Sequence, residues 1–226
     1  ELQDKAYDYQ EDLFEWLVEP CLRFVRKNCK ELIPTSDINL PFALMNIFES
    51  LMDPFRVAEG EEVSMNEKEQ RIFVDCAFVF SIVWSIGGTT ENAGRKKFDD
   101  FLRRLVDHRV ELKPDRKDFD LGPGLTIVPP SRSKQQKLYK SFPSGAEGTV
   151  YDLVFVREVM QWKNWLKTVE SKPVDEKLEF QDIVVTTIDT VRYRFLFDLL
   201  VGHGKHVLFG GPTGTGKTVY IKQSLD

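Results

Sequence analysis

The sequence predicts a mainly α-helical first half, followed by the beginning of an α/β domain that contains a phosphate-binding loop. Apolar residues recur at the three- and four-residue spacing of amphipathic helices over residues 1–110. Near the carboxyl end, a short apolar run, a glycine-rich segment and a new helical pattern follow one another over residues 206–226. That order is the strand, loop and helix of a P-loop unit.

The composition is that of a globular protein. Hydrophobic residues make up 42% and charged residues 30% of the 226 positions, which suits one large domain or two small ones. The net charge of −5 argues against a nucleic-acid partner, because phosphate backbones attract basic surfaces. Residues 1–5 are polar and predict no signal peptide. The apolar run Ile72–Ile86 is shorter than the roughly 20 residues of a bilayer span, so we expect a buried helix and no membrane partner.

Cysteine and histidine residues do not predict a metal site. The three cysteines lack the spacing of a disulfide framework or a zinc site, and we expect buried free thiols in a reducing compartment: Cys21, Cys29 and Cys76. The three histidines have no metal-ligating neighbours at useful spacing, and we expect them to face solvent or form hydrogen bonds: His108, His203 and His206.

Two helices are expected in the first 55 residues. The spacing of Leu13, Leu17 and Phe24 predicts the first, and Pro20 should kink or restart it. Asn39 is the predicted cap of the second, with Pro41 in its first turn. The inward face of that second helix should consist of Leu40, Leu44, Ile47, Phe48 and Leu51. The pair Asp53-Pro54 should end it.

Two further helices complete the predicted helical part. Asn66 and Glu69 have the spacing of a capping box, and the helix behind them should run to about Ile86, buried on all sides. Gly87-Gly88 should stop it through a left-handed conformation. A last helix from about Glu91 should present Phe98, Phe101, Leu102 and Leu105 to the core.

Proline and glycine change the character of the chain over residues 111–148. We expect extended loops there, forming a linker to a second unit. Thr149–Val156 is rich in β-formers and predicts a strand, whereas residues 157–170 fit either a second hairpin strand or a helix. The expected domains are therefore a helical subdomain at 1–110, a linker at 111–148 and the start of an α/β subdomain at 149–226.

From Ile183 onward the predicted order is an extended piece, a helix and a short strand. Ile183–Val185 reads as an extended piece, and Thr186 and Thr187 can cap a helix over residues 188–201. The core face of that helix should consist of Val191, Phe195, Leu199 and Leu200. His206–Phe209 should be a short buried strand leading into the glycine-rich segment.

Residues Gly211–Thr218 match the pattern GxxxxGK[ST] of a phosphate-binding loop. Glycines let the backbone wrap around phosphate oxygens, and inward N–H groups with the positive helix end attract the anion. Lys217 should contact the β- and γ-phosphates, and the Thr218 hydroxyl should bind Mg²⁺. The expected ligand is ATP or ADP with Mg²⁺, and the candidate contact residues are Gly211, Pro212, Thr213, Gly214, Thr215, Gly216, Lys217, Thr218 and Val219.

Binding a nucleotide does not require hydrolysing it. Hydrolysis also needs an acidic residue on a later strand and usually an arginine from a neighbour. We expect those groups after Asp226, in a larger protein of which this chain is a piece, and we predict no catalytic residue within the 226 residues.

Several segments resemble the dynein heavy chain family, and their residues are more similar to its axonemal members than to its cytoplasmic members. Ile183–Tyr193 followed by Val207–Thr218 is similar to the start of the third AAA+ module of these chains. Leu13–Leu22 and Trp84–Gly88 resemble the small helical part of the second module. The resemblance implies a fragment of a larger AAA+ ring.

The resemblance also implies a function. Members of the family are ATP-driven, minus-end-directed microtubule motors of cilia and flagella, and their third module binds nucleotide to regulate the cycle. Val184 and Val185 would then lie against the adenine. The implied partners are neighbouring AAA+ modules of the same chain, microtubules through regions outside this piece, and dynein intermediate and light chains. The implied location is the cytoplasm, cytoskeleton and ciliary axoneme.

Two other functions remain open from the sequence. One is a structural ring segment that binds nucleotide without turnover. The other is an unrelated P-loop kinase or GTPase, against which the roughly 110 helical residues upstream of the loop argue, since such enzymes do not need them.

Overall fold

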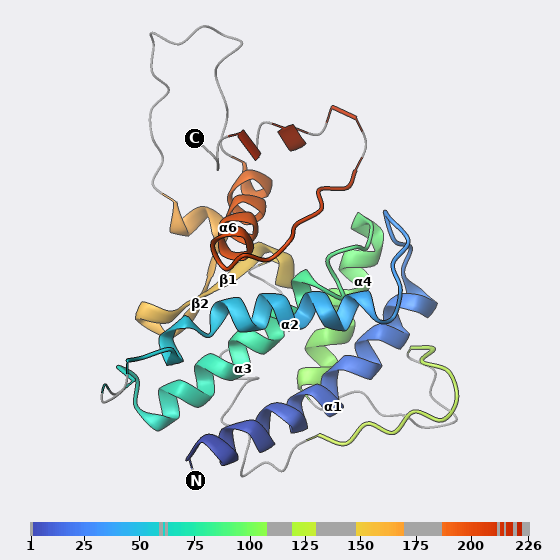
Figure 1. The fold of residues 1–226 in the computed structure, drawn as a ribbon. Helices are drawn as coiled ribbons and strands as arrows, with labels where there is room; N and C mark the ends of the chain where they lie inside the picture. The colour runs from blue at the N-terminus through green and yellow to red at the C-terminus, as the bar shows by residue number, and fades with distance from the viewer. Residues whose placement is uncertain are drawn as a thin grey trace, which may run out of the picture.

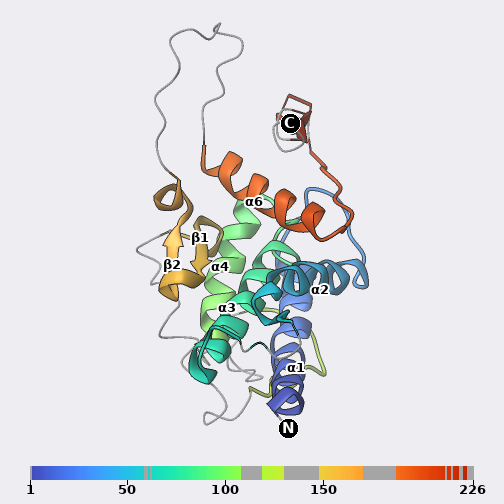
Figure 2. The same cartoon turned by 60° about the vertical axis from the view of Figure 1, so that its left-hand side comes forward.

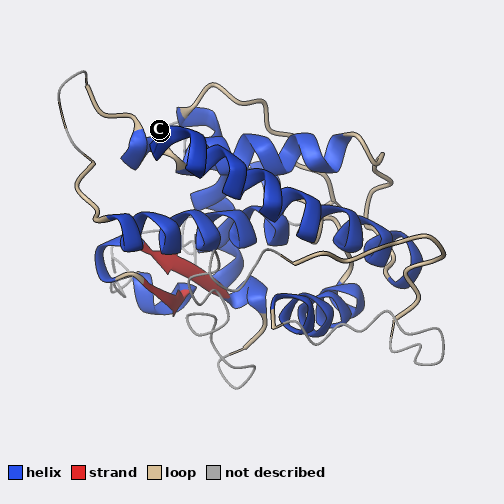
Figure 3. Ribbon diagram, turned by 90° about the horizontal axis from the view of Figure 1, so that it is seen from below, coloured by secondary structure: helices blue, strands red, loops and turns tan. Residues whose placement is uncertain are grey.

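The computed structural model describes residues 2–58, 61, 63–107, 119–129, 148–169, 187–211, 213–214, 216–218, 221 and 222. The described part is a body of helices with two short strands at one edge (Figure 1, Figure 3). Its α-helices are α1 (Leu2–Asn28), α2 (Asn39–Leu51), α3 (Glu67–Trp84), α4 (Asn92–Val106) and α6 (Ile188–Gly202). The strands are β1 (Leu153–Val156) and β2 (Gln161–Asn164).

Helix α1 runs without interruption through Pro20. Of the two expected effects of Pro20, a restart of the helix is therefore wrong, and a kink stays a prediction. One face of α1 is buried against the other helices, including Trp16, Leu17 and Phe24, so tertiary packing outweighs the single backbone hydrogen bond that proline cannot donate.

Helix α2 begins at Asn39, the residue predicted to be its cap, and so starts one residue earlier than expected. Ile38 is the capping residue and makes no side-chain capping bond, while Asn39 is already helical. The Asn39 amide is instead satisfied by Ser36, whose hydroxyl accepts from it at 3.3 Å. The predicted inward face is confirmed, with Leu51 partly buried and the other four residues buried: Leu40, Leu44, Ile47 and Phe48.

Helix α3 starts with the predicted capping box. The Asn66 side chain accepts from the Glu69 amide at 3.0 Å, and the Glu69 carboxylate accepts from the Asn66 amide at 3.0 Å. Every residue from Phe73 to Trp84 is buried, which confirms a central core helix. Within the described residues, no helix combines the length and apolar character needed to cross a bilayer.

The glycines after α3 do not act through a left-handed conformation, because neither Gly87 nor Gly88 has a positive φ. A Cβ on Gly87 would lie 2.6 Å from the Phe98 ring and from the Tyr151 hydroxyl. A Cβ on Gly88 would lie 2.5 Å from the Trp84 carbonyl oxygen. Close packing, not backbone freedom, therefore explains this glycine pair.

Helix α4 is confirmed, and all four of its predicted core residues are buried: Phe98, Phe101, Leu102 and Leu105. Residues 119–129 have no helix or strand, and residues 111–118 and 130–147 of the predicted linker lie outside the described residues. Phe119 packs edge-on against Phe24 and Phe101, at ring-centroid distances of 5.3 and 5.2 Å, so this segment is held against α1 and α4.

Residues 148–169 form an antiparallel hairpin with a short 3-10 turn at each end, which confirms the hairpin alternative for Gln161–Asn164. The strand predicted from Thr149 begins only at Leu153, because Thr149 and Asp152 close a capping box around the turn η3 (Val150–Asp152). The Tyr151 hydroxyl donates to the Gly87 carbonyl at 2.9 Å, and this bond fixes the hairpin to the end of α3.

Thr187 caps helix α6, as predicted, and its side chain accepts from the Thr190 amide. The predicted core face is only partly buried: Val191, Phe195, Leu199 and Leu200. The buried residues of α6 are instead Thr190, Arg192 and Phe197. Helix α6 lies across the body next to α2 (Figure 1, Figure 2). Ile183–Val185 and Thr186 lie outside the described residues.

The segment after α6 is extended but forms no strand, which corrects the short buried strand expected at His206–Phe209. Leu208 is 90% exposed. A strand needs a neighbour to complete its hydrogen-bond ladder, and the described residues supply none beside this segment.

The cysteines are free thiols, with Cys21 and Cys76 buried and Cys29 half-buried. Burial raises the pKa of Cys29 to about 11, because the apolar surroundings disfavour a thiolate. No group of three or more metal-ligating side chains gathers within the described ranges, and His108 lies outside them.

Candidate functional site

The glycine-rich loop carries the backbone geometry that its sequence pattern requires. Gly214 and Gly216 have φ angles of +83° and +76°, a conformation that side chains with a Cβ rarely adopt. Gly211, Thr213, Gly214 and Thr218 are exposed, so the loop is open to solvent. Of the predicted contact residues, five lie outside the described residues: Val184, Val185, Pro212, Thr215 and Val219.

Lys217 lies over the loop that precedes it. Its ammonium nitrogen donates to the Gly211 carbonyl oxygen at 3.0 Å, across the six residues of the loop. Lys217 and Thr218 are helical, so the loop leads directly into a helix start, as the motif predicts. The ammonium group and the helix N-terminus therefore face the same turn of backbone.

This donor set fits a polyphosphate. It combines one ammonium group, backbone N–H groups at a helix start and a hydroxyl, and residues 211–218 contain no carboxylate to repel the anion. Thr218 would contribute the single hydroxyl ligand of a nucleotide-bound Mg²⁺. Residues 211–218 contain no Asp, Glu or His, the side chains that most often act as a general base.

Two polar contacts tie the chain entering the loop to the helical part. His203 Nε2 lies 2.8 Å from Asp53 Oδ2, and Lys205 Nζ lies 2.5 Å from Glu49 Oε2. The partners are separated by 150 and 156 positions in the sequence. The sequence indicated only that His203 would face solvent or form hydrogen bonds, and no local pattern could have paired residues this far apart.

Aromatic rings anchor α6 itself. The Trp165 ring packs against Phe195 of α6 at 5.3 Å between centroids and against Phe80 of α3 at 6.1 Å. Trp84 packs against Tyr151 at 5.8 Å and against Tyr193 of α6 at 6.1 Å. This aromatic cluster joins α3, the hairpin and α6, so the start of the loop is positioned from the helical core.

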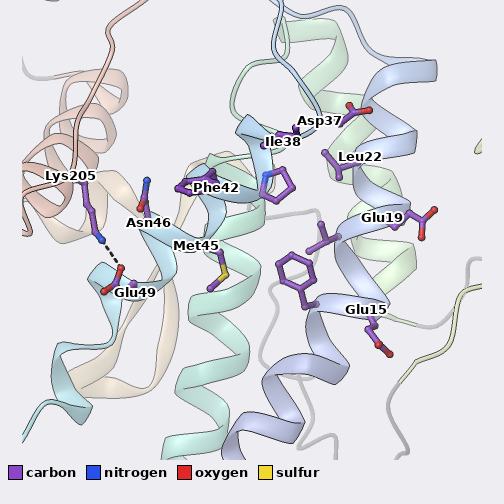
Figure 4. Close-up of a pocket in the computed structure, with 13 residues that line it drawn as sticks. Glu15, Glu19, Leu22, Asp37, Ile38, Phe42, Met45, Asn46, Glu49 and Lys205 are labelled. Carbon is purple, nitrogen blue, oxygen red and sulfur yellow. Dashed lines mark hydrogen bonds and ion pairs between the residues drawn. The ribbon is translucent and has the colours of Figure 1, made fainter.

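An open groove of about 1050 Å³ lies between α1 and α2, away from the loop glycines. Its apolar surface includes Phe42, which is 69% exposed, and Ile38, which is 76% exposed. Lys205 and Glu49 meet at one side of this groove, as the dashed line in Figure 4 shows. The groove contains no nucleotide-binding motif and is not part of the candidate phosphate site.

The fold and the loop together define a class of protein. A helical body that packs onto a hairpin and is followed by a P-loop motif fits a fragment of an AAA+ ring. A profile of the dynein heavy chain AAA lid domain matches residues 10–167, and a profile of the P-loop containing dynein motor region matches residues 172–226. The chain belongs to the dynein heavy chain family.

The chain is similar in sequence to axonemal dynein heavy chains. The chain is 34% identical to human dynein axonemal heavy chain 3 over 221 residues, and 36% identical to mouse dynein axonemal heavy chain 12 over 218 residues. It is 31% identical to human dynein axonemal heavy chain 1 over 217 residues. These matches cover 94–95% of this chain but only 5–6% of each relative, so the chain spans a small part of their length.

Membership of the dynein heavy chain family rules out one of the alternative functions left open by the sequence. An unrelated P-loop kinase or GTPase is excluded, because the helical residues upstream of the loop match a dynein lid. The domain division at residues 110 and 148 stays a prediction.

Proposed function

We propose that Gly211–Thr218 binds ATP with Mg²⁺ and that this site regulates a dynein motor without producing its main power stroke. The observation that carries the proposal is the Lys217 ammonium group held over the glycine loop at a helix start. A mobile cation, backbone donors and a hydroxyl at this spacing suit the β- and γ-phosphates of a nucleotide and little else.

Each residue of the proposed site would have a separate role in binding the nucleotide. Gly214 and Gly216 allow the backbone to curve around phosphate oxygens, and Lys217 would exchange its bond to the Gly211 carbonyl for bonds to the phosphates. Thr218 would hold Mg²⁺, which supplies charge neutralisation between the phosphates. Val184 and Val185 would contact the adenine, and Pro212, Thr213, Thr215 and Val219 would line the loop.

We further propose the place of this site in the whole protein. The lid would close the second AAA+ module, and the loop would open the third. The complete heavy chain would move along microtubules in the ciliary axoneme and act with intermediate and light chains. Similarity to axonemal heavy chains supports this proposal.

The test is peptide-resolved hydrogen exchange of the full-length heavy chain, with and without ATP and Mg²⁺. Residues 205–222 should become protected when nucleotide binds. In Lys217→Ala the apparent affinity at these peptides should fall by about 10- to 100-fold, the size of a lost charge-assisted hydrogen bond. The matched control is Lys222→Ala, which removes an exposed lysine five residues later. Unchanged protection in Lys217→Ala would refute the phosphate role of this residue.

The same experiment separates a regulatory site from a fixed structural ligand. A regulatory site should release its nucleotide when ATP is diluted, and protection of residues 205–222 should decay within the motor cycle. A fixed ligand would remain through many cycles, and only a mutation such as Lys217→Ala would remove it. Microtubule gliding by the Lys217→Ala heavy chain should slow under the regulatory function.

A further inference from the structure

The chain between α6 and the phosphate loop is fastened to the lid by a histidine with two acceptors. His203 Nδ1 lies 2.7 Å from the Leu199 carbonyl oxygen, and Nε2 lies 2.8 Å from the Asp53 carboxylate. The His203 side chain is 18% exposed, so most of the ring is shielded from water. Both ring nitrogens thus face oxygen atoms of the protein.

An oxygen acceptor against each ring nitrogen favours the protonated imidazolium ring of His203. A neutral imidazole has one N–H and one unprotonated nitrogen, so it can donate to only one of two acceptors. A carbonyl oxygen cannot donate, and Asp53 already accepts from the Arg56 guanidinium at 3.1 Å, which favours an ionised carboxylate. The two bonds to His203 therefore coexist only when the ring carries a positive charge.

Four charged groups surround the ring. Asp53 lies on the turn η1 (Asp53–Phe55) and favours the protonated ring, whereas Arg56 opposes it. Glu49 and Lys205 pair with each other at 2.5 Å beside it. The pKa of His203 is raised above its usual value, first by the bond to the Leu199 carbonyl and then by the bond to Asp53. The favourable contacts therefore outweigh the guanidinium.

The neighbouring contact does not respond to pH in the same range. The Lys205 ammonium group lowers the pKa of Glu49 below its usual value, so this pair stays charged near neutral pH. The chain entering the loop therefore has one bond to the lid that depends on a proton and one that does not. Lys205 and Glu49 are seen together in Figure 4.

We propose that His203 and Asp53 form a proton-dependent latch, which fastens the chain that enters the phosphate loop to the lid of the preceding module. The latch is closed when the ring is protonated. Because folding raises the pKa of His203, the latch is fully formed below its unfolded pKa of about 6.5 and is lost as pH rises through the higher folded value. When the latch is open, the Lys205–Glu49 pair still ties this segment to α2.

The physical consequence is a change in local order at the entrance to the loop. The latch joins a surface carboxylate that is 57% exposed to a shielded ring, so its strength should be modest and should fall with added salt. The latch concerns the position of residues 203–210 and does not require nucleotide. It can therefore be tested independently of the proposed ATP site.

The experiment is hydrogen exchange of peptides covering residues 199–211 in the full-length heavy chain without nucleotide, at about pH 6 and about pH 8.5, which bracket histidine titration. Rates are corrected for the intrinsic pH dependence of exchange. In the wild type, the corrected rate should rise about three-fold at the higher pH, a change typical of one partly exposed ion pair.

Three variants make the result specific. His203→Gln keeps a neutral donor and should remove the pH dependence, and Asp53→Asn should exchange at about pH 6 as fast as the wild type does at about pH 8.5. His206→Gln is the matched control, since His206 is exposed on the same segment, and it should behave as the wild type. A wild-type rate that does not change with pH, or a His203→Gln variant that keeps the wild-type change, would overturn the proposal.

Discussion

At the scale of single residues, close packing explains more than backbone conformation does. Gly87 was expected to end α3 because glycine tolerates a left-handed turn, yet its φ is not positive. The residue is small because the Phe98 ring and the Tyr151 hydroxyl approach its backbone. Its carbonyl oxygen also accepts the Tyr151 hydroxyl at 2.9 Å, so the site is a contact between the lid helices and the hairpin.

Gly87→Ala should therefore destabilise the lid. The added methyl group would lie 2.6 Å from two side-chain atoms, and overpacking of this kind costs about 1–3 kcal/mol. Gly202→Ala is the matched control, since nothing lies within 4 Å of its Cβ position and alanine favours helix. Hydrogen exchange of α3 in the heavy chain measures the local free energy of unfolding. Equal stability of the two variants would contradict a packing role for Gly87.

At the scale of helices and strands, the helix-capping patterns, which involve residues close in sequence, predicted the structure best. The capping box at Asn66 and Glu69 depends on residues three positions apart, and both of its hydrogen bonds are present. Thr187 at the start of α6 follows the same rule. Helix starts are readable because the groups that satisfy the first backbone N–H groups are close in sequence.

Asn66→Ala should loosen the start of α3. It removes the acceptor of the Glu69 amide, and loss of such a cap costs about 0.5–2 kcal/mol. Ser64→Ala, an exposed change two residues before the cap, should have little effect and serves as the control. Faster exchange of the α3 amides in Asn66→Ala alone is the expected result, and equal rates in both variants would argue against the cap.

Predictions that depended on distant partners were less successful. The apolar run at His206–Phe209 predicts a short buried strand, but Leu208 is 90% exposed because the described residues provide no neighbouring strand. Pro20 in isolation indicates a kink or a restart of the helix, yet α1 does not restart there because its tertiary packing keeps it continuous. The phosphate loop was predictable from its spacing, whereas the His203–Asp53 contact was not, since it joins residues 150 positions apart.

At the scale of the whole molecule, one buried arginine helps to join α6 to the lid. The Arg192 side chain is 10% exposed, pairs with Asp189, and lies 3.8 Å from Asp152 of the hairpin. Its guanidinium group also lies 5.7 Å from the centre of the Trp84 ring. Because α6 leads into the phosphate loop, this arginine connects the lid core to the position of the loop.

Arg192→Ala should loosen α6 from the lid. The change removes a mostly buried side chain with charged and aromatic contacts, and its expected cost is about 1–3 kcal/mol. Arg194→Ala is the control on the same helix, since that side chain is 52% exposed. Exchange of α6 amides in the heavy chain should accelerate in Arg192→Ala and stay near the wild-type rate in the control. Acceleration of the same size in both variants would assign the effect to the helix surface.

The hairpin bond to Gly87 also has a consequence for synthesis on the ribosome. Tyr151 follows Gly87 by 64 positions, and buried Trp165 follows later still. At about 5–20 residues per second, the roughly 60 residues after α4 take about 3–12 s to be made. During that interval the apolar ends of α3 and α4 lack the side chains that later cover them. The lid of a nascent heavy chain is therefore a place where chaperones would be needed before the following module exists.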